Sequence, residues 1–189
     1  MIPKKIHYVW LGKGEKNDTI KKCMESWKQL GYEIKEWNED NFDINYNKFT
    51  KQSYDLKKYA FTSDVIRLYA LYTEGGIYLD TDVEVFKSLN EFLNEPAFTG
   101  FEEPNFPVCA TMGAEKGNPI IKQMLDYYND KDFADKTNTR IMSEILAENG
   151  IDRNKHEKQK IKDFSIYPTE YFNCKDGYTF HHMNGSWLK

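Results

Sequence analysis

The feature that most constrains this chain is an apolar run that ends in two carboxylates. Residues 60–72 carry apolar side chains on nearly every face of a helix, and glycines at 75–76 follow as its stop. Residues 77–79 then read as a buried strand directly before Asp80 and Asp82. In extended backbone, side chains two residues apart point to the same side, so both carboxylates are predicted to face one ligand.

Two carboxylates held close together need a positive partner. Their repulsion raises the pKa of one of them unless a cation or a shared proton relieves it. Hard oxygen ligands of this kind favour Mg²⁺, Ca²⁺ or Mn²⁺. A lone Asp-x-Asp is also common as a solvated turn after a strand, so the surrounding sequence has to decide between a turn and a metal site.

The helix before this strand carries a charged pair. Asp64 and Arg67 are three residues apart and therefore share one helical face. Charged side chains on so apolar a helix need partners. Either the two form a local ion pair that fixes the helix, or both project into a polar cleft and hold hydroxyl or phosphate groups there.

The rest of the chain alternates strands and helices. A strand at 6–12, a helix that Asp18 caps and Gly31 ends, and a strand at 32–37 predict a parallel βαβ unit. Further strands are predicted at 83–86, 97–101 and 108–112, and further helices at 119–128 and 139–149. This order is typical of an α/β domain.

Five more side chains are candidates for a site. Trp10, at the end of the first strand, either stacks on a nucleobase or is a core or rim aromatic. His181 and His182 lie in a strand-like segment and face opposite sides, so at most one joins a given site, and both read equally as a packed or surface pair. Glu102 and Glu103 are predicted to be solvated loop residues.

Composition excludes several classes of protein. The 189 residues carry a net charge of −4 without a dense basic stripe, which argues against nucleic-acid binding. Cys23, Cys109 and Cys174 are too few and too scattered for a disulfide framework, which favours a reducing compartment. With neither a signal-peptide core nor an apolar run of about 20 residues, the chain is expected to be cytoplasmic, with peripheral contact at the inner face of the membrane left open.

These pieces resemble a known family. Ser63-Asp64-x-x-Arg67 followed by Gly75-Gly76-Ile77-Tyr78-Leu79-Asp80-x-Asp82 is similar to the Asp-x-Asp sugar transferases of glycosyltransferase family 32. That family includes yeast α-mannosyltransferases and bacterial capsular-polysaccharide enzymes, and the pattern also looks like the catalytic domain of the clostridial glucosylating toxins. The opening segment 2–12 and the closing segment 181–187 add to the resemblance.

The resemblance implies an α/β fold of GT-A type. It is a Rossmann-like sandwich with a central, mostly parallel sheet flanked by helices, and it binds a nucleotide-sugar across the carboxyl ends of the strands. The whole chain, 1–189, is expected to form one such domain. The domain is short at its C-terminus, because the family often carries additional helices there.

By the same resemblance, particular residues receive roles. Val9, Trp10, Ser63 and Tyr78 line the nucleotide site, and Asp64 and Arg67 hold the hydroxyls of the donor sugar. Asp80 contacts ribose or a metal-bound water, and Asp82 ligates the metal directly. One of His181 and His182, with His181 favoured, approaches the metal or diphosphate, which Ser186 and Trp187 also touch.

The implied activity is a hexose transfer that needs Mn²⁺ or Mg²⁺. The donor is a UDP- or GDP-sugar, with UDP favoured, and the acceptor is a saccharide or glycolipid in bacterial polysaccharide biosynthesis. Retention of anomeric configuration is expected, as in the family. Two alternatives remain: a truncated domain that binds a nucleotide-sugar with weak or no turnover, and an effector that glycosylates host proteins.

Overall fold

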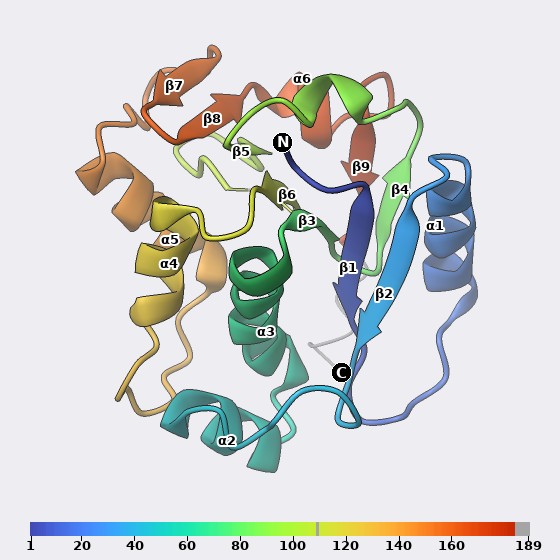
Figure 1. Cartoon of the computed structure of the whole chain (residues 1–189), viewed down its shortest axis with the longest axis vertical. Helices are drawn as coiled ribbons and strands as arrows, with labels where there is room; N and C mark the ends of the chain where they lie inside the picture. Colours follow the sequence, from blue (N-terminus) through green and yellow to red (C-terminus); the bar gives the residue numbers. More distant parts are fainter. Residues whose placement is uncertain (109, 184–189) are drawn as a thin grey trace.

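A seven-stranded sheet in the order β2-β1-β3-β6-β5-β8-β7 forms the centre of the computed structural model, which describes residues 1–108 and 110–183 (Figure 1). Its strands are β1 (Lys5–Val9), β2 (Glu33–Trp37), β3 (Gly76–Leu79), β5 (Ala97–Gly100), β6 (Thr111–Ala114), β7 (Gln159–Ile161) and β8 (Phe164–Tyr167). A separate two-stranded sheet pairs β4 (Val83–Val85) with β9 (Thr179–His181).

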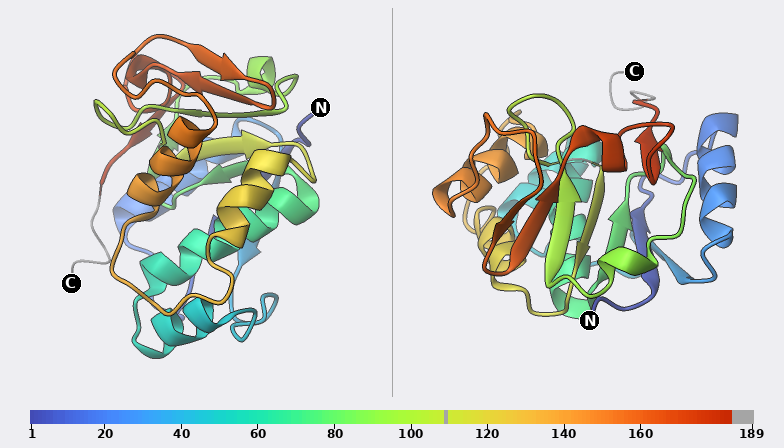
Figure 2. Two further views of the ribbon diagram at one scale, coloured as in Figure 1. Left: turned by 90° about the vertical axis from the view of Figure 1, so that its left-hand side faces the viewer. Right: turned by 90° about the horizontal axis from the view of Figure 1, so that it is seen from above.

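Six α-helices and one 3-10 turn accompany the described strands. They are α1 (Asp18–Lys28), α2 (Lys48–Asp55), α3 (Tyr59–Glu74), the turn η1 (Asn90–Phe92), α4 (Pro119–Asp126), α5 (Asn138–Glu148) and α6 (Thr169–Phe172). In the views of Figures 1 and 2, α1 stands apart from α3, α4 and α5. None of the helices in the described part of the chain is long and apolar enough to cross a membrane.

Strand direction confirms the α/β fold with a mostly parallel sheet. Strand β1 is parallel to β2 and β3, and β5 is parallel to β8. Only β6 and β7 run antiparallel to their neighbours. Five of the seven strands therefore run one way, and their carboxyl ends meet at one edge of the sheet, where α/β proteins bind ligands.

Alternation along the central strands divides the core into two layers. Val9 and Tyr78 belong to a cluster that α3 and α4 complete, through residues such as Val65 and Ile121. Their strand neighbours on the opposite face form a second cluster with α1, β4, η1 and α6: Ile6, Tyr8, Ile77, Leu79, Trp27, Val83, Phe92 and Phe172. Because side chains alternate across a strand, these short buried strands separate two helix-covered faces.

The predicted buried helix and its stop are both present. Helix α3 ends at Glu74, and Gly75 and Gly76 take the positive φ angles of 68° and 122°. A Cβ at Gly76 would lie 2.7 Å from the carbonyl oxygen of Lys5. Glycine is therefore required where the chain leaves α3 and enters β3 against β1.

The start of α1 differs from the prediction. The cap is Asn17, not Asp18: the Asn17 Oδ1 accepts a hydrogen bond from the backbone N of Ile20 at 3.0 Å. Asp18 is instead the first helical residue, where its negative charge interacts favourably with the helix dipole. Both residues are good caps, so their adjacency left the boundary uncertain by one position.

The observed cap can be tested against the predicted one. Asn17→Ala is expected to lower the free energy of unfolding by about 1 kcal/mol, since an amide at the helix start loses its acceptor. Asp18→Ala removes only a favourable charge and is expected to cost about 0.3–0.5 kcal/mol. Urea denaturation of both variants checks the order, and a larger loss for Asp18→Ala would contradict it.

Candidate active site and metal centre

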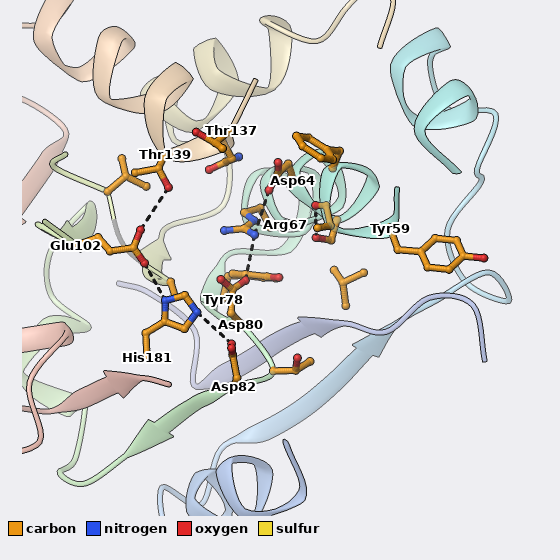
Figure 3. A pocket seen from close by; sticks show the side chains of 18 of the residues that line it. Tyr59, Asp64, Arg67, Tyr78, Asp80, Asp82, Glu102, Thr137, Thr139 and His181 are labelled. Carbon is orange, nitrogen blue, oxygen red and sulfur yellow. Dashed lines mark hydrogen bonds and ion pairs between the residues drawn. The ribbon is translucent and has the colours of Figure 1, made fainter. Parts of the chain in front are cut away.

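A cavity of about 930 Å³ lies at the edge where the parallel strands end (Figure 3). Trp10 follows β1, Asp80 follows β3 and Glu102 follows β5, and all three line it. Its volume is within the range of about 300–1,000 Å³ that is usual for ligand sites. Strand direction thus gathers residues that are far apart in sequence at the mouth of one pocket.

The Asp-x-Asp pair occupies a turn, not the extended strand that the spacing predicts. Strand β3 ends at Leu79, and the backbone N of Val83 donates to the carbonyl of Asp80 at 3.0 Å, which closes the turn before β4. Asp80 and Asp82 nevertheless both line the cavity. The two carboxylates come together as predicted, although a turn, and not strand alternation, is the reason.

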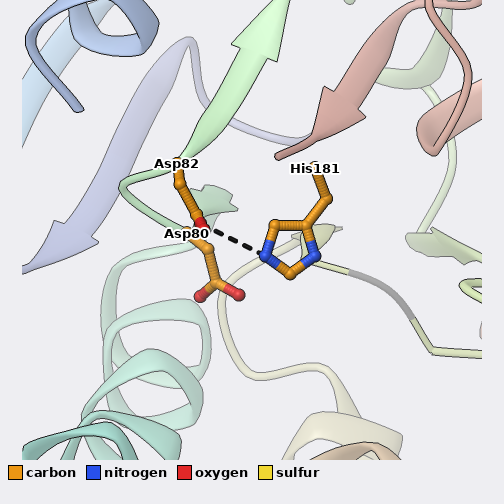
Figure 4. A group of neighbouring side chains, drawn as sticks. All are labelled: Asp80, Asp82 and His181. Carbon is orange, nitrogen blue, oxygen red and sulfur yellow. Dashed lines mark ion pairs between the residues drawn. The ribbon is translucent and has the colours of Figure 1, made fainter. Parts of the chain in front are cut away.

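Pairing of β4 with β9 brings a histidine to this turn. Val83 is the register partner of His181, so His181 stands beside the Asp-x-Asp turn (Figure 4). One possible ligand atom each from Asp80, Asp82 and His181 lies within 4.8 Å of the other two. Two carboxylates and an imidazole fit Mn²⁺ or Mg²⁺, and three protein ligands would leave coordination positions for other oxygens.

Arg67 connects the helix to the acidic turn. Its Nη2 lies 3.1 Å from Asp64 Oδ1 and 3.0 Å from Asp80 Oδ1, and its guanidinium lies 4.6 Å from the centre of the Tyr78 ring. Burial raises the pKa of Asp64 to about 7, against the opposing attraction of Arg67. The Asp64–Arg67 pair is therefore a local ion pair and also part of the cavity wall, and its contact with hydroxyl or phosphate groups stays a prediction.

The two neighbouring histidines have different surroundings. His181 Nε2 is 3.2 Å from Asp82 Oδ1, and its Nδ1 is 2.8 Å from Glu102 Oε1. Burial alone would lower the pKa of His181, but hydrogen bonds to these two carboxylates raise it to about 10. His182 lies apart from the metal candidates, with its Nε2 2.8 Å from Glu84 Oε2.

The residues expected around the nucleotide share the same cavity. Val9, Trp10, Ser63 and Tyr78 all line it. The Trp10 indole is fixed by a 2.9 Å hydrogen bond from its Nε1 to the carbonyl of Gly14. Ser186 and Trp187 fall outside the described residues, so their roles stay predictions.

Several lining residues were missed by the sequence interpretation. Glu102 was predicted to be solvated, yet it contacts His181 inside the cavity. Residues 137–140 at the start of α5 also line the cavity, and Tyr59 lines it on the side away from Glu102 (Figure 3). Glu102 follows a strand that runs parallel to β3, and this position places it at the same edge of the sheet as Asp80. That relation could be recognised only from the order of the strands in the sheet.

Comparison with known families identifies the central motif. Residues 14–99 match the family model described as a glycosyltransferase sugar-binding region containing a DXD motif. That range contains Ser63, Asp64 and Arg67 together with Asp80 and Asp82, the residues that converge at the cavity.

Two proteins of similar sequence are named as sugar transferases. The chain is 31% identical over 134 residues to inositol phosphoceramide mannosyltransferase 3 of Schizosaccharomyces pombe, across 66% of this chain and 36% of that protein, so it spans about a third of its length. A glycosyltransferase of Acanthamoeba polyphaga mimivirus is 26% identical across 99% of this chain and 84% of its own. The solved structure of the PaToxG glycosyltransferase superposes with a TM-score of 0.57 at 19% identity, covering 78% of this chain and 68% of that one, and supports the GT-A-like fold.

Proposed function

We propose that this chain transfers a hexose from a nucleotide-sugar to a saccharide or glycolipid acceptor, with Mn²⁺ or Mg²⁺ as cofactor; the match of residues 14–99 to a glycosyltransferase sugar-binding region containing a DXD motif and the similarity to glycosyltransferases support this proposal. The observation that carries the proposal is the group of Asp80, Asp82 and His181 at a cavity of about 930 Å³. We favour a UDP-sugar as donor and bacterial polysaccharide synthesis as the setting.

The charges in the cavity suit a diphosphate leaving group. A bound divalent cation would offset the negative charge that develops on the diphosphate as the sugar bond breaks. Asp80, Asp82 and His181 would hold that cation. Lys57 and Lys58 line the same cavity and add positive charge near the entry of α3.

We assign binding of the donor sugar to Asp64 and Arg67. Arg67 is held between two carboxylates, so its guanidinium keeps one orientation without a ligand's help. A side chain fixed in this way orients a sugar hydroxyl at small entropic cost. Asp64 supplies acceptor oxygens on the same wall.

We further propose that the anomeric configuration is retained through front-face attack. In that step the hydroxyl oxygen of the acceptor bonds to the anomeric carbon as the bond between that carbon and the diphosphate oxygen breaks. The proton of the acceptor hydroxyl passes to the departing diphosphate oxygen. NMR spectra of the product measure the new linkage, and an inverted anomeric centre would contradict this route.

A donor panel tests the proposed activity. The protein is incubated with UDP- and GDP-sugars, Mn²⁺, and saccharide or glycolipid acceptors, and released nucleotide is measured together with glycosylated product. Release that EDTA stops and that excess Mn²⁺ restores is the expected result. Binding of nucleotide-sugar without release under every condition would favour the alternative of a binding domain.

The nucleobase contact gives a separate prediction. Trp10→Ala is expected to raise the KM for the nucleotide-sugar by about 10- to 100-fold with a smaller change in kcat, because base–aromatic stacking contributes about 1–3 kcal/mol. Trp10→Phe should recover most of the affinity, since it keeps an aromatic face. Equal affinities of the wild type and Trp10→Ala for UDP in calorimetry would show that the indole does not contact the base.

A further inference from the structure

The two ring nitrogens of His181 face different carboxylates. Nε2 lies 3.2 Å from Asp82 Oδ1, on the side of the metal candidates, and Nδ1 lies 2.8 Å from Glu102 Oε1, on the opposite side (Figure 3). Both His181 and Glu102 are largely withdrawn from solvent, with side chains 17% and 16% exposed. Glu102 is outside the group of three residues whose atoms could share an ion.

We propose that Glu102 is a positioning residue for the metal centre: by accepting the Nδ1–H of His181, it turns Nε2 towards Asp82, Asp80 and a bound divalent cation. This inference rests on the proposed metal-dependent function. It assigns a role to a side chain in the loop that follows β5, outside the three candidate ligands.

The backbone around Glu102 is tied to that of His181. The Asn173 side chain donates from Nδ2 to the carbonyl of Glu102 at 3.1 Å and accepts from the backbone N of His181 at 3.3 Å. The backbone N of Glu102 donates in turn to the carbonyl of Phe106 at 3.1 Å. One amide therefore connects both residues, so the distance between imidazole and carboxylate is set by the fold.

An acceptor for Nδ1–H matters because an imidazole ring rotates easily about its Cβ–Cγ bond. Rotations of this type have broad, roughly two-fold preferences, and a flip exchanges nitrogen and carbon positions. A hydrogen bond at one nitrogen removes this ambiguity and fixes the other nitrogen as the ligand. Glutamine also presents an acceptor oxygen, whereas leucine presents none.

Glu103 supplies a matched control. It is the next residue and lines the same cavity. Its recorded partner among the described residues is Phe106, through a backbone bridge, and no hydrogen bond to His181 is found there. Substitution of Glu103 thus changes the charge of the cavity by the same amount without removing the acceptor for His181.

The experiment measures Mn²⁺ affinity and the state of His181 separately. Mn²⁺ binding is titrated by calorimetry for the wild type, Glu102→Leu, Glu102→Gln and Glu103→Leu, with thermal melts to confirm folding. The Nδ1–H of His181 is followed by NMR with ¹⁵N-labelled histidine, with and without diamagnetic Mg²⁺. The protein has only four histidines, and His181→Gln identifies the signal.

We expect Glu102→Leu to weaken Mn²⁺ binding about 10- to 100-fold, the usual effect of losing the hydrogen-bond partner of a ligating histidine. Glu102→Gln should stay within about 3-fold of the wild type, and Glu103→Leu should match it. The Nδ1–H signal should be protected from exchange in the wild type and in Glu102→Gln, and lost in Glu102→Leu.

Three results would overturn the inference. Equal Mn²⁺ affinities for Glu102→Leu and Glu103→Leu would show that no positioning occurs. A Glu102→Gln variant as weak as Glu102→Leu would make the carboxylate charge, not the hydrogen bond, the decisive property. An unprotected Nδ1–H in the wild type would refute the contact even if Glu102→Leu does not fold. Failure of the wild type to bind any ion would instead refute the metal centre itself.

Discussion

Asp82→Asn is expected to reduce nucleotide release by about 1,000-fold or more. The substitution keeps the size of the side chain and removes the charge that a divalent cation needs, and the cation's stabilisation of the leaving diphosphate is worth several kcal/mol. Asp82 stands in the turn between β3 and β4, with His181 beside it. Both kcat and Mn²⁺ affinity are measured, because loss of the ion should lower the two together.

Glu84→Gln is the matched control for that variant. Glu84 is two residues further along, on β4, where it pairs with Lys22 and His182. It does not line the cavity, so its substitution is expected to leave nucleotide release within about 2-fold. A similar loss in Glu84→Gln and Asp82→Asn would mean that charge in this region, and not a specific ligand, supports activity.

Arg67→Met is expected to lower the free energy of unfolding by about 3–5 kcal/mol, the usual cost of removing one partner from a buried ion pair. Arg67 is 9% exposed and neutralises both Asp64 and Asp80. Methionine retains much of the apolar stem but leaves two carboxylates without their cation. Urea denaturation measures the loss, and Arg67→Met combined with Asp64→Asn should recover part of it.

The loss should also depend on pH. Burial already raises the folded-state pKa of Asp64 to about 7, above the ordinary value of 3.8, and removal of Arg67 should raise it further. A group with a raised folded-state pKa binds its proton more tightly in the folded chain, so stability is gained as pH falls and lost as pH rises through that pKa. Arg67→Met should therefore be less destabilised at pH 5 than at pH 8.

An exposed ion pair provides the comparison for Arg67. Lys51 and Asp55 lie four residues apart on α2 with side chains 55% and 56% exposed, 2.8 Å from each other. Lys51→Met is expected to cost less than about 1 kcal/mol, because solvent screens such pairs. If both methionine variants lost the same stability, the burial of Arg67 would not explain its role.

Local patterns were sufficient to predict the elements that carry the acidic residues. The apolar run and the glycine pair specified α3 and β3, and the spacing of Asp64 and Arg67 specified a shared helical face. Residues 83–86 were predicted as a strand and His181 was placed in a strand-like segment, and these two segments pair as β4 and β9. These are short-range signals, in which neighbouring residues alone determine the conformation.

Short-range patterns could not predict the order of the strands in the sheet. Strand β6 enters between β3 and β5 in the antiparallel sense, and this non-local choice brings the end of β5 close to the end of β3. Glu102 therefore read as a solvated loop residue until its neighbours in space were known. Strand β8, whose four residues are all buried, was not predicted either.

The pairing of β4 with β9 joins the proposed metal site from two segments that lie far apart in the sequence. The acidic turn precedes β4, whereas His181 comes with β9, so the three candidate ligands come together only when these two strands pair. Docking of β9 also depends on Thr179, whose hydroxyl donates to the carbonyl of Phe172 at 2.8 Å. Affinity for the proposed metal ion would therefore report how firmly β9 is attached, and a substitution that weakens this attachment would lower that affinity without changing any of the three candidate ligands.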